Sequence, residues 1–352
     1  MNNHFKTWFG AFVMTAGLFS ISTAHALAGK GNVLVVLNKT DNTASLIDPS
    51  SGSVGATVGT GVAPHEVAAH GGRGLAVASN YGTRAQPGAT LTVIDLGRQK
   101  SLRTIDLGRY RRPHGIQFFR DGHRVAVTAE DNQCLLLVDI DRGVVQKAIR
   151  THQQTSHMVV LGPEEKRAYV ANIGSGSVSV LDLTQGTLIK NIPTGGGAEG
   201  LDISPQGREL WVGNRAQDTL SIIDTGKLEV VATLKSASFP IRVKFTPDGQ
   251  RVLVSNARSG EVAVFSVKQR KEIGRIPMKV TAAENESRLL QFGQSPVPIG
   301  IVVAPDGETA FVANSNADVV SVIDLGAWEI KDRFRAGKQP DGMAYVEGDS
   351  GR

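Results

Sequence analysis

The chain has 352 residues, of which 41% are hydrophobic and 20% are charged, and it carries 40 glycines. This composition is typical of a globular protein with many turns and excludes a disordered or fibrous chain. The formal net charge of +5 is too small to indicate nucleic-acid binding, and it slightly favours anionic partners. The single cysteine, Cys134, excludes an internal disulfide, and its place in the apolar run QCLLLVD indicates a buried, inert thiol.

Residues 1–26 are predicted to be a secretory signal peptide. Lys6 precedes an apolar run that starts at Trp8, and Ala24-His25-Ala26 offers the small-x-small cleavage pattern. The run is about 14 residues long, short of the ~20 needed to span a bilayer, although an uncleaved anchor helix is the alternative. We therefore expect a soluble mature chain without a membrane span, located in the periplasm or secreted.

The remainder, residues 27–352, is predicted to be one repeat domain. A phrase of two apolar residues followed by aspartate recurs about every 42 residues. The copies end at Asp48, Asp95, Asp139, Asp182, Asp224 and Asp324, with a degenerate copy at Ser266. Ten residues before most of these positions stands an asparagine: Asn38, Asn172, Asn214, Asn256 and Asn314, with Asn80 displaced by an insertion and Ala129 substituting in the third copy.

Each copy contains four short stretches with alternating apolar residues, separated by turn signals such as Pro-Asp-Gly. This pattern predicts an all-β fold, a seven-bladed β-propeller of four-stranded antiparallel blades. The chain starts with the second strand of a blade, GNVLVVLN, and a stray strand at 338–346 supplies the missing one. We expect this C-terminal strand to pair into the first blade and to close the ring, which removes exposed edges.

The repeats with YVAN at 169–172, FVAN at 311–314, VIDL and Pro-Asp-Gly resemble the YVTN family of β-propellers, close to the periplasmic YncE-like proteins. The resemblance covers about residues 31–346 and implies the propeller fold. It implies no particular activity, because one fold hosts many functions. The phrase SNYG at 79–82 also resembles lactonase-type propellers.

One residue lies fifteen positions before each asparagine-type position, at the start of the predicted innermost strand. In blade order these residues are His65, His114, His157, Glu199, Ile241 and Ile299, with Asp341 in the closing strand. Because the ring closes, five consecutive blades offer polar side chains at one level near the axis. Three of the six histidines after the signal peptide fall on this position, which composition does not explain.

Neutral imidazoles bind divalent transition metals and leave positions open for water or substrate. We predict His65, His114, His157 and Asp341 as metal ligands and Glu199 as a catalytic base. Two other interpretations stay open: a hydrogen-bonded plug, and acid–base histidines that work without a metal. Without a metal, these histidines are expected to titrate near their ordinary pKa of ~6.5.

The loops before the innermost strands and after the asparagines share the histidine mouth. Arg84, Arg111, Arg112 and Arg242 are predicted to form a positive rim that binds a carboxylate or phosphate, unless they are merely solvated surface charges. Tyr81, Tyr110 and Glu130 would add polar contacts. An insertion at 281–295 is predicted to be either a short helical lid or a passive loop.

These features favour a metal-assisted hydrolase or lyase that acts on an anionic small molecule. The alternative is a non-catalytic scaffold that docks an envelope protein. Nucleic acid is not an expected partner, because only Trp211 and Trp328 remain after signal removal and Trp211 sits at a core position. A monomer is expected.

Overall fold

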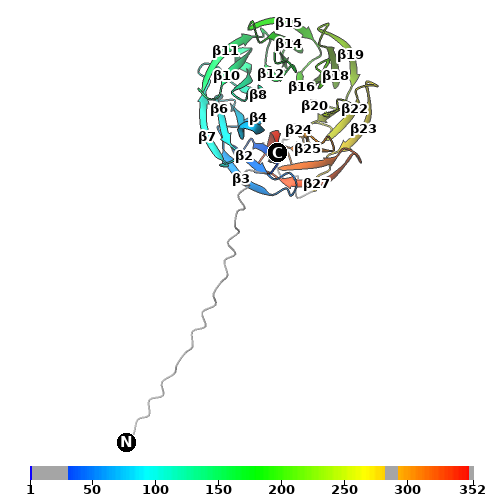
Figure 1. Cartoon of the computed structure of the whole chain (residues 1–352). Coiled ribbons are helices and arrows are strands. Elements are labelled where there is room, and N and C mark those ends of the chain that lie inside the picture. Colours follow the sequence, from blue (N-terminus) through cyan, green and yellow to red (C-terminus); the bar gives the residue numbers. More distant parts are fainter. Residues whose placement is uncertain (2–30, 282–291, 349–352) are drawn as a thin grey trace.

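The computed structural model describes residues 31–281 and 292–348, together with Met1. Within these residues the chain forms seven four-stranded antiparallel sheets arranged around one axis (Figure 1). The predicted all-β, seven-bladed propeller is therefore confirmed. The predicted signal peptide and most of the insertion at 281–295 lie outside the described residues.

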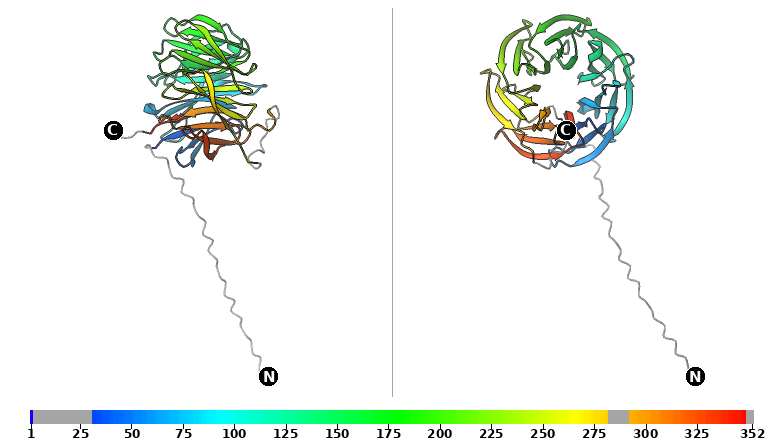
Figure 2. Two further views of the ribbon diagram at one scale, coloured as in Figure 1. Left: turned by 90° about the vertical axis from the view of Figure 1, so that its right-hand side faces the viewer. Right: turned by 180° about the vertical axis from the view of Figure 1, so that it is seen from behind.

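In each blade the first strand lies nearest the axis and the fourth lies at the outside, as the view from behind shows (Figure 2). Blade 1 contains β28 (Pro340–Val346), β1 (Val33–Asn38), β2 (Thr43–Ile47) and β3 (Val54–Gly59). Blade 2 contains β4 (Pro64–His70), β5 (Leu75–Gly82), β6 (Pro87–Asp95) and β7 (Lys100–Asp106). Blade 3 contains β8 (Pro113–Phe118), β9 (Arg124–Ala129), β10 (Cys134–Asp139) and β11 (Val144–Arg150).

The other four blades repeat this order. Blade 4 contains β12 (Ser156–Leu161), β13 (Arg167–Asn172), β14 (Ser177–Asp182) and β15 (Thr187–Pro193). Blade 5 contains β16 (Ala198–Ile203), β17 (Glu209–Asn214), β18 (Thr219–Asp224) and β19 (Glu229–Lys235). Blade 6 contains β20 (Pro240–Phe245), β21 (Arg251–Asn256), β22 (Glu261–Ser266) and β23 (Lys271–Pro277), and blade 7 contains β24 (Pro298–Val303), β25 (Thr309–Asn314), β26 (Val319–Asp324) and β27 (Glu329–Arg335).

The ring is closed by pairing the last strand with the first. β28 runs antiparallel to β1, with Val33 opposite Val346 and Val36 opposite Met343. The connection is extended by the backbone N–H of Lys39, which donates to the carbonyl of Gln339 at 3.1 Å. The predicted closure is therefore confirmed, and it leaves β1 paired on both sides rather than as an open edge.

Five of the six recurring asparagines end the second strand of their blades, Asn80 lies two residues before the end of β5, and all six are buried. Asn38, for example, donates from Nδ2 to Ser45 Oγ at 2.9 Å and accepts the backbone N–H of Gly337 at 2.9 Å. Each is paired with the first residue of the innermost strand, as Asn80 is with Pro64. These side chains thus join the second strand to the third strand and to the loop before the innermost strand, which helps fix the register of the blade.

Apolar side chains from neighbouring blades pack face to face. One core cluster lies between each pair of adjacent blades within the described residues, including the pair joined by ring closure. Trp211 is fully buried between blades 5 and 6, and Cys134 is buried between blades 2 and 3, as predicted. The stability of the domain thus comes from burial between blades rather than from one central core.

The innermost strands of neighbouring blades approach each other closely near the axis. A Cβ at Gly200 would lie 2.4 Å from the carbonyl oxygen of Ile241, and one at Gly342 would lie 2.4 Å from that of His65. Glycine is therefore needed at both positions. This close approach brings the start of each innermost strand, with its polar residues, to the same region of the channel.

Candidate functional site

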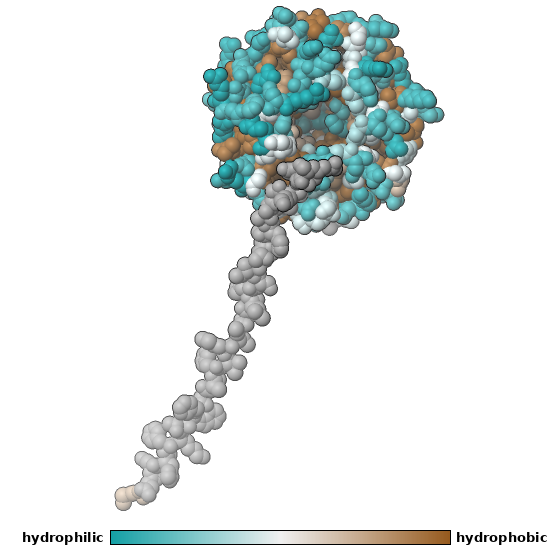
Figure 3. Space-filling model, in the orientation of Figure 1, coloured by the Kyte–Doolittle hydropathy of each residue, from teal (hydrophilic) through white to brown (hydrophobic). Residues whose placement is uncertain are grey.

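The start of the innermost strands forms a cavity at one mouth of the central channel. The second residue of each innermost strand lines this cavity, whose volume is about 300 Å³. These seven residues are His65, His114, His157, Glu199, Ile241, Ile299 and Asp341. The structure therefore brings together every residue that the repeat spacing placed at one level. The space-filling view shows the opposite face of the ring, where β28 ends, and there too the centre of the ring is hollow (Figure 3).

A second set of side chains comes from the residue directly after each asparagine-type position. In blade order these are Lys39, Tyr81, Glu130, Ile173, Arg215, Ala257 and Ser315. Several pair with the first set inside one blade: Lys39 Nζ lies 3.2 Å from Asp341 Oδ2, and Arg215 forms an ion pair with Glu199. Sequence reasoning named only Tyr81 and Glu130 from this set. Counting one residue past each asparagine-type position would have identified the others.

The three histidines form a column on one side of the cavity, with their rings tilted against one another. The ring centroids of His114 and His157 are 3.6 Å apart, and those of His65 and His114 are 5.1 Å apart. Tyr81 packs beside the column, with its ring centroid 4.3 Å from that of His65. All three imidazoles come from consecutive blades, so blade-to-blade geometry alone sets their spacing.

His157 is held between two carboxylates. Its Nδ1 donates to Glu130 Oε1, and its Nε2 lies 3.3 Å from Glu199 Oε1. Burial lowers the pKa of His157, but Glu130 and Glu199 outweigh burial and raise the pKa to about 9. At neutral pH His157 therefore carries a positive charge while it has no metal bound.

The other two histidines behave in the opposite way. Burial lowers the pKa of His65 to about 4, and burial together with the neighbouring His157 holds the pKa of His114 well below its ordinary value. The expectation that the histidines titrate together near pH ~6.5 is thus wrong, because each has a different set of charged neighbours. Two neutral imidazoles and one imidazolium share the column.

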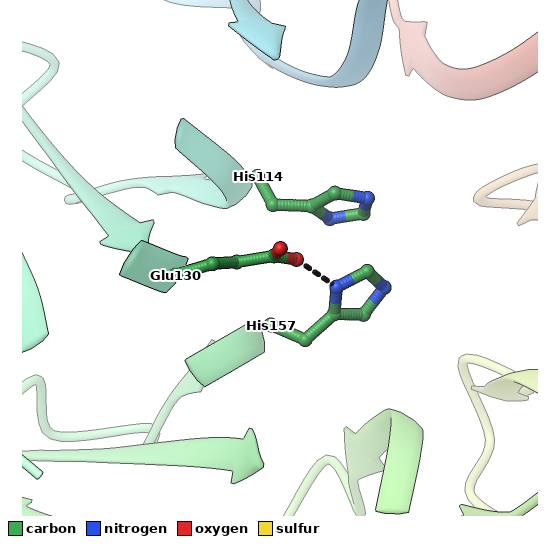
Figure 4. Close-up of side chains that lie close together, drawn as sticks. All are labelled: His114, Glu130 and His157. Atoms are coloured by element: carbon green, nitrogen blue, oxygen red, sulfur yellow. Dashed lines mark hydrogen bonds and ion pairs between the residues drawn. The ribbon is translucent and has the colours of Figure 1, made fainter. Parts of the chain in front are cut away.

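His114, Glu130 and His157 make up a group that could hold a metal ion. Each offers one ligand atom, and these atoms all lie within 4.8 Å of one another (Figure 4). The buried Nδ1 of His114 has no hydrogen-bond partner among the described residues. Nitrogen and carboxylate donors of this kind suit zinc, nickel, cobalt or iron. A shared ion would take the place of the bond between His157 and Glu130.

This donor group lacks two of the four predicted ligands, His65 and Asp341, and contains Glu130 in addition. Asp341 is engaged by Lys39, which lowers the pKa of its carboxyl group despite burial. His65 is turned so that Nδ1 lies 2.9 Å from the carbonyl oxygen of Ala63. Glu130 takes the place of Asp341 because the loop after β9 carries it inward beside His157.

Arg242 lies inside the channel rather than on its rim. Its guanidinium forms an ion pair with Glu66 of blade 2, on the far side of the axis, and lies 3.5 Å from Glu199 of blade 5. It also donates to the carbonyl of Ile241 at 2.9 Å. Burial lowers its pKa, but the surrounding carboxylates outweigh burial and raise it, so the group stays charged. Arg242 therefore bridges the channel as a structural cation.

Taken together, these contacts form a chain of polar side chains that begins and ends in blade 2. Its members, drawn from blades 2 to 6, are Tyr81, Glu130, His157, Glu199, Arg242 and Glu66. The first contact is the Tyr81 hydroxyl, which donates to Glu130 Oε2 at 2.7 Å. Tyr81 belongs to blade 2, which also supplies Glu66 at the other end of the chain of contacts. Each buried charge thus has an opposite charge beside it.

The other predicted arginines lie outside the cavity. Arg84 is exposed in the loop between β5 and β6. Arg111 donates to the carbonyl groups of its own loop, and Arg112 Nε lies 3.4 Å from Asp131 Oδ1. The cations that line the cavity are instead Lys39, Arg215, Arg242 and Arg258. The loop before β8 folds back on itself, which sequence periodicity does not reveal.

Comparison with known families decides where this propeller belongs. Residues 42–286 match a family model described as "Lactonase, 7-bladed beta-propeller". The chain belongs to this family. The match covers more than two thirds of the chain and includes β4, β8, β12 and β16, which carry His65, His114, His157 and Glu199.

Individual relatives of this family member are distant. The chain is 24% identical over 236 residues to the seven-bladed beta-propeller protein Rv1057 of Mycobacterium tuberculosis, a match that covers 60% of this chain and 59% of that protein. It thus spans about three fifths of the length of the curated relative it matches. Among the described residues, no helix is long and apolar enough to cross a membrane.

Two solved structures share the architecture. Hydrazine synthase of Kuenenia stuttgartiensis superposes with a TM-score of 0.66 at 18% identity, covering 82% of this chain and 96% of that chain. A functionally unknown protein from Desulfotomaculum acetoxidans superposes with a TM-score of 0.75 at 12% identity, covering 91% of this chain and all of that one. At these identities the likeness concerns the fold alone.

Proposed function

We propose that this protein is a hydrolase that opens lactone or related ester bonds of a small anionic molecule in the channel mouth, with a divalent transition metal at His114, Glu130 and His157. The observation that carries the proposal is the buried Nδ1 of His114, which has no hydrogen-bond partner in the part of the chain that the structure describes and lies beside a second imidazole, a carboxylate and a cavity. The name of the matched family supports the choice of bond.

The donor set fits such an ion. A bound ion would polarise a carbonyl oxygen and lower the pKa of a water molecule. Metal binding needs the neutral form of His157, so uptake of the ion would displace a proton from that residue. Tyr81, which donates to the second carboxylate oxygen of Glu130, would orient this ligand.

Two other polar residues of the cavity, Glu199 and His65, have lowered pKa values. Glu199 was predicted to be the base, but its pKa is lowered by His157, Arg215 and Arg242, which outweigh burial, and a base with a low pKa is weak. We assign it instead the positioning of His157. His65 bonds through Nδ1 to the carbonyl of Ala63, and burial lowers its pKa to about 4, so it stays neutral near pH 7 and by the same argument is a weak base.

The same proposal includes the setting in which the protein works. Within the matched family we place the chain with the YVTN-repeat, YncE-like propellers, on the strength of its YVAN and FVAN repeats. The N-terminal pattern of residues 1–26 supports export to the periplasm or medium. The alternative, a scaffold that docks an envelope protein, requires neither a metal nor hydrolysis.

The test is metal analysis of untagged protein combined with hydrolysis of a lactone panel. We expect about one metal ion per chain in the wild type, and loss of both metal and hydrolysis in His114→Ala. His123→Ala is the matched control, because His123 is exposed and pairs with Asp141 away from the cavity. A wild type that binds no metal and opens no lactone, or a His114→Ala variant that keeps both properties, would overturn the proposal.

A further inference from the structure

The cavity has a polar side and an apolar side. Blades 6 and 7 place Ile241 and Ile299 where the other blades place histidines and carboxylates. These isoleucines form a small cluster with Ala257 and Val297, and Phe239 and Phe292 pack against it. The two phenylalanine rings meet edge to face, with centroids 5.3 Å apart. One wall of the cavity is thus continuous hydrocarbon.

Phe239 has a backbone conformation that is uncommon for a residue other than glycine. It precedes the innermost strand of blade 6 and has a φ of 68°, in the left-handed region. Ala63 and Gln339 occupy the equivalent turn in other blades and also have positive φ. The turn is therefore a feature of the repeat, whereas the aromatic ring at the cavity is particular to blade 6.

This wall faces a cavity open to water. Phe239, Ile241, Ile299 and Phe292 all line it, opposite the histidine column. Apolar surface in a concave site is a binding surface for an apolar group, because covering it removes hydrocarbon from water. The isoleucines are therefore matched to the body of a ligand, while the histidines are matched to its polar part.

Two guanidinium groups lie over the ring of Phe239. Arg215 Cζ is 5.1 Å and Arg258 Cζ is 4.9 Å from the ring centroid, and both residues line the cavity. Arg215 is engaged by Glu199. The exposed guanidinium of Arg258 forms no hydrogen bond or ion pair among the described residues, so it keeps its donors for a ligand. A guanidinium binds carboxylates through paired hydrogen bonds.

We propose that the ligand of this cavity is an amphipathic anion: a short aliphatic or aromatic body lies against Phe239, Ile241 and Ile299, and a carboxylate binds Arg258. This inference rests on the proposed function, since it names the ligand class of the same cavity. The reactive bond then faces His114 and His157. Arg258 is a specificity-determining residue, and it is not one of the arginines that the sequence pattern singled out.

The experiment measures binding of butanoate, hexanoate and hexan-1-ol to protein freed of metal with EDTA, by ligand-observed NMR titration. Each methylene that the wall fully covers should tighten binding about fourfold, so hexanoate should bind up to ~15-fold more tightly than butanoate. Arg258→Gln should weaken hexanoate about tenfold and leave hexan-1-ol unchanged, and Arg258→Lys should fall between. Ile299→Thr should flatten the dependence on chain length.

Arg84→Gln is the matched control, because Arg84 is an exposed arginine that does not line the cavity. Equal affinity for butanoate and hexanoate, or a hexanoate affinity that is unchanged in Arg258→Gln, would overturn the inference. Because the titration uses metal-free protein, it separates the two proposals. If hexanoate binds as expected but the protein takes up no metal and opens no lactone, the proposed ligand class stands and the proposed hydrolase activity is wrong.

Discussion

Truncation after Ala336 should unfold the whole domain, because it removes β28 from blade 1. The deleted segment pairs with β1 at five register positions, beginning at Val33 opposite Val346. It also buries Met343 in the cluster between blades 7 and 1, and Val346 in the cluster between blades 1 and 2. No disulfide is available as a staple, because the chain has one cysteine.

The loss can be estimated from these contacts. Burial of Met343 and Val346, each 8% exposed, contributes about 1.5–3 kcal/mol per side chain. The strand ladder adds about 5 kcal/mol at roughly 1 kcal/mol per net hydrogen bond. The total of about 8–11 kcal/mol falls within the range of about 5–15 kcal/mol that stabilises an entire domain.

The assay is thermal and urea unfolding followed by far-ultraviolet circular dichroism. The truncated chain should show no cooperative transition, whereas truncation after Gly348 keeps β28 whole and should melt like the full chain. A cooperative melt of the Ala336 truncation at the wild-type temperature would refute the reasoning. It would mean that the remaining blades hold the ring without the closing strand.

Three further predictions concern single side chains. Arg242→Met leaves Glu66 buried without its cation, whereas Glu199 keeps Arg215 and His157. Urea unfolding should therefore show a loss of about 3–5 kcal/mol, and Glu66→Gln in the same chain should restore part of it. Tyr81→Phe should weaken metal binding about 10–100-fold in a chelator competition, while Tyr110→Phe, outside the cavity, should not. Burial raises the pKa of the Cys134 thiol to about 11, so a thiol reagent at pH 8 should react only after urea unfolds the chain; rapid reaction of the folded protein would contradict the burial.

The fold could be predicted because each copy of the repeat has the same strand register as well as a similar composition. The asparagine that ends each second strand faces the first residue of the innermost strand, as Asn214 faces Ala198. A fixed sequence offset from that asparagine therefore corresponds to a fixed place in space. For this reason the spacing rule placed Glu199 and its six counterparts correctly, although they lie far apart in the sequence.

The rest of the site depends on contacts that cross between blades, and no offset within one repeat describes these. Arg242 was expected at the rim, but it follows the residue that lines the mouth and reaches Glu66 across the axis. Glu130 entered the donor group because its loop turns toward His157 of the next blade. The direction of a long side chain, or of a loop with its own hydrogen bonds such as the loop that holds Arg111, cannot be deduced from the repeat and requires a structure.

The charged side chains that are buried in the channel raise the question of why the channel is polar at all. Buried ion pairs add little stability over well-packed apolar side chains, because desolvation offsets their attraction. The molecule contains its own comparison: Ile241 and Ile299 occupy the repeat position that holds His114 or Glu199 in other blades, and they are buried there without distortion of the ring. The scaffold therefore accepts aliphatic side chains at this position. Since folding does not require the imidazoles and carboxylates of blades 1 to 5, their concentration on one side of the cavity points to a ligand.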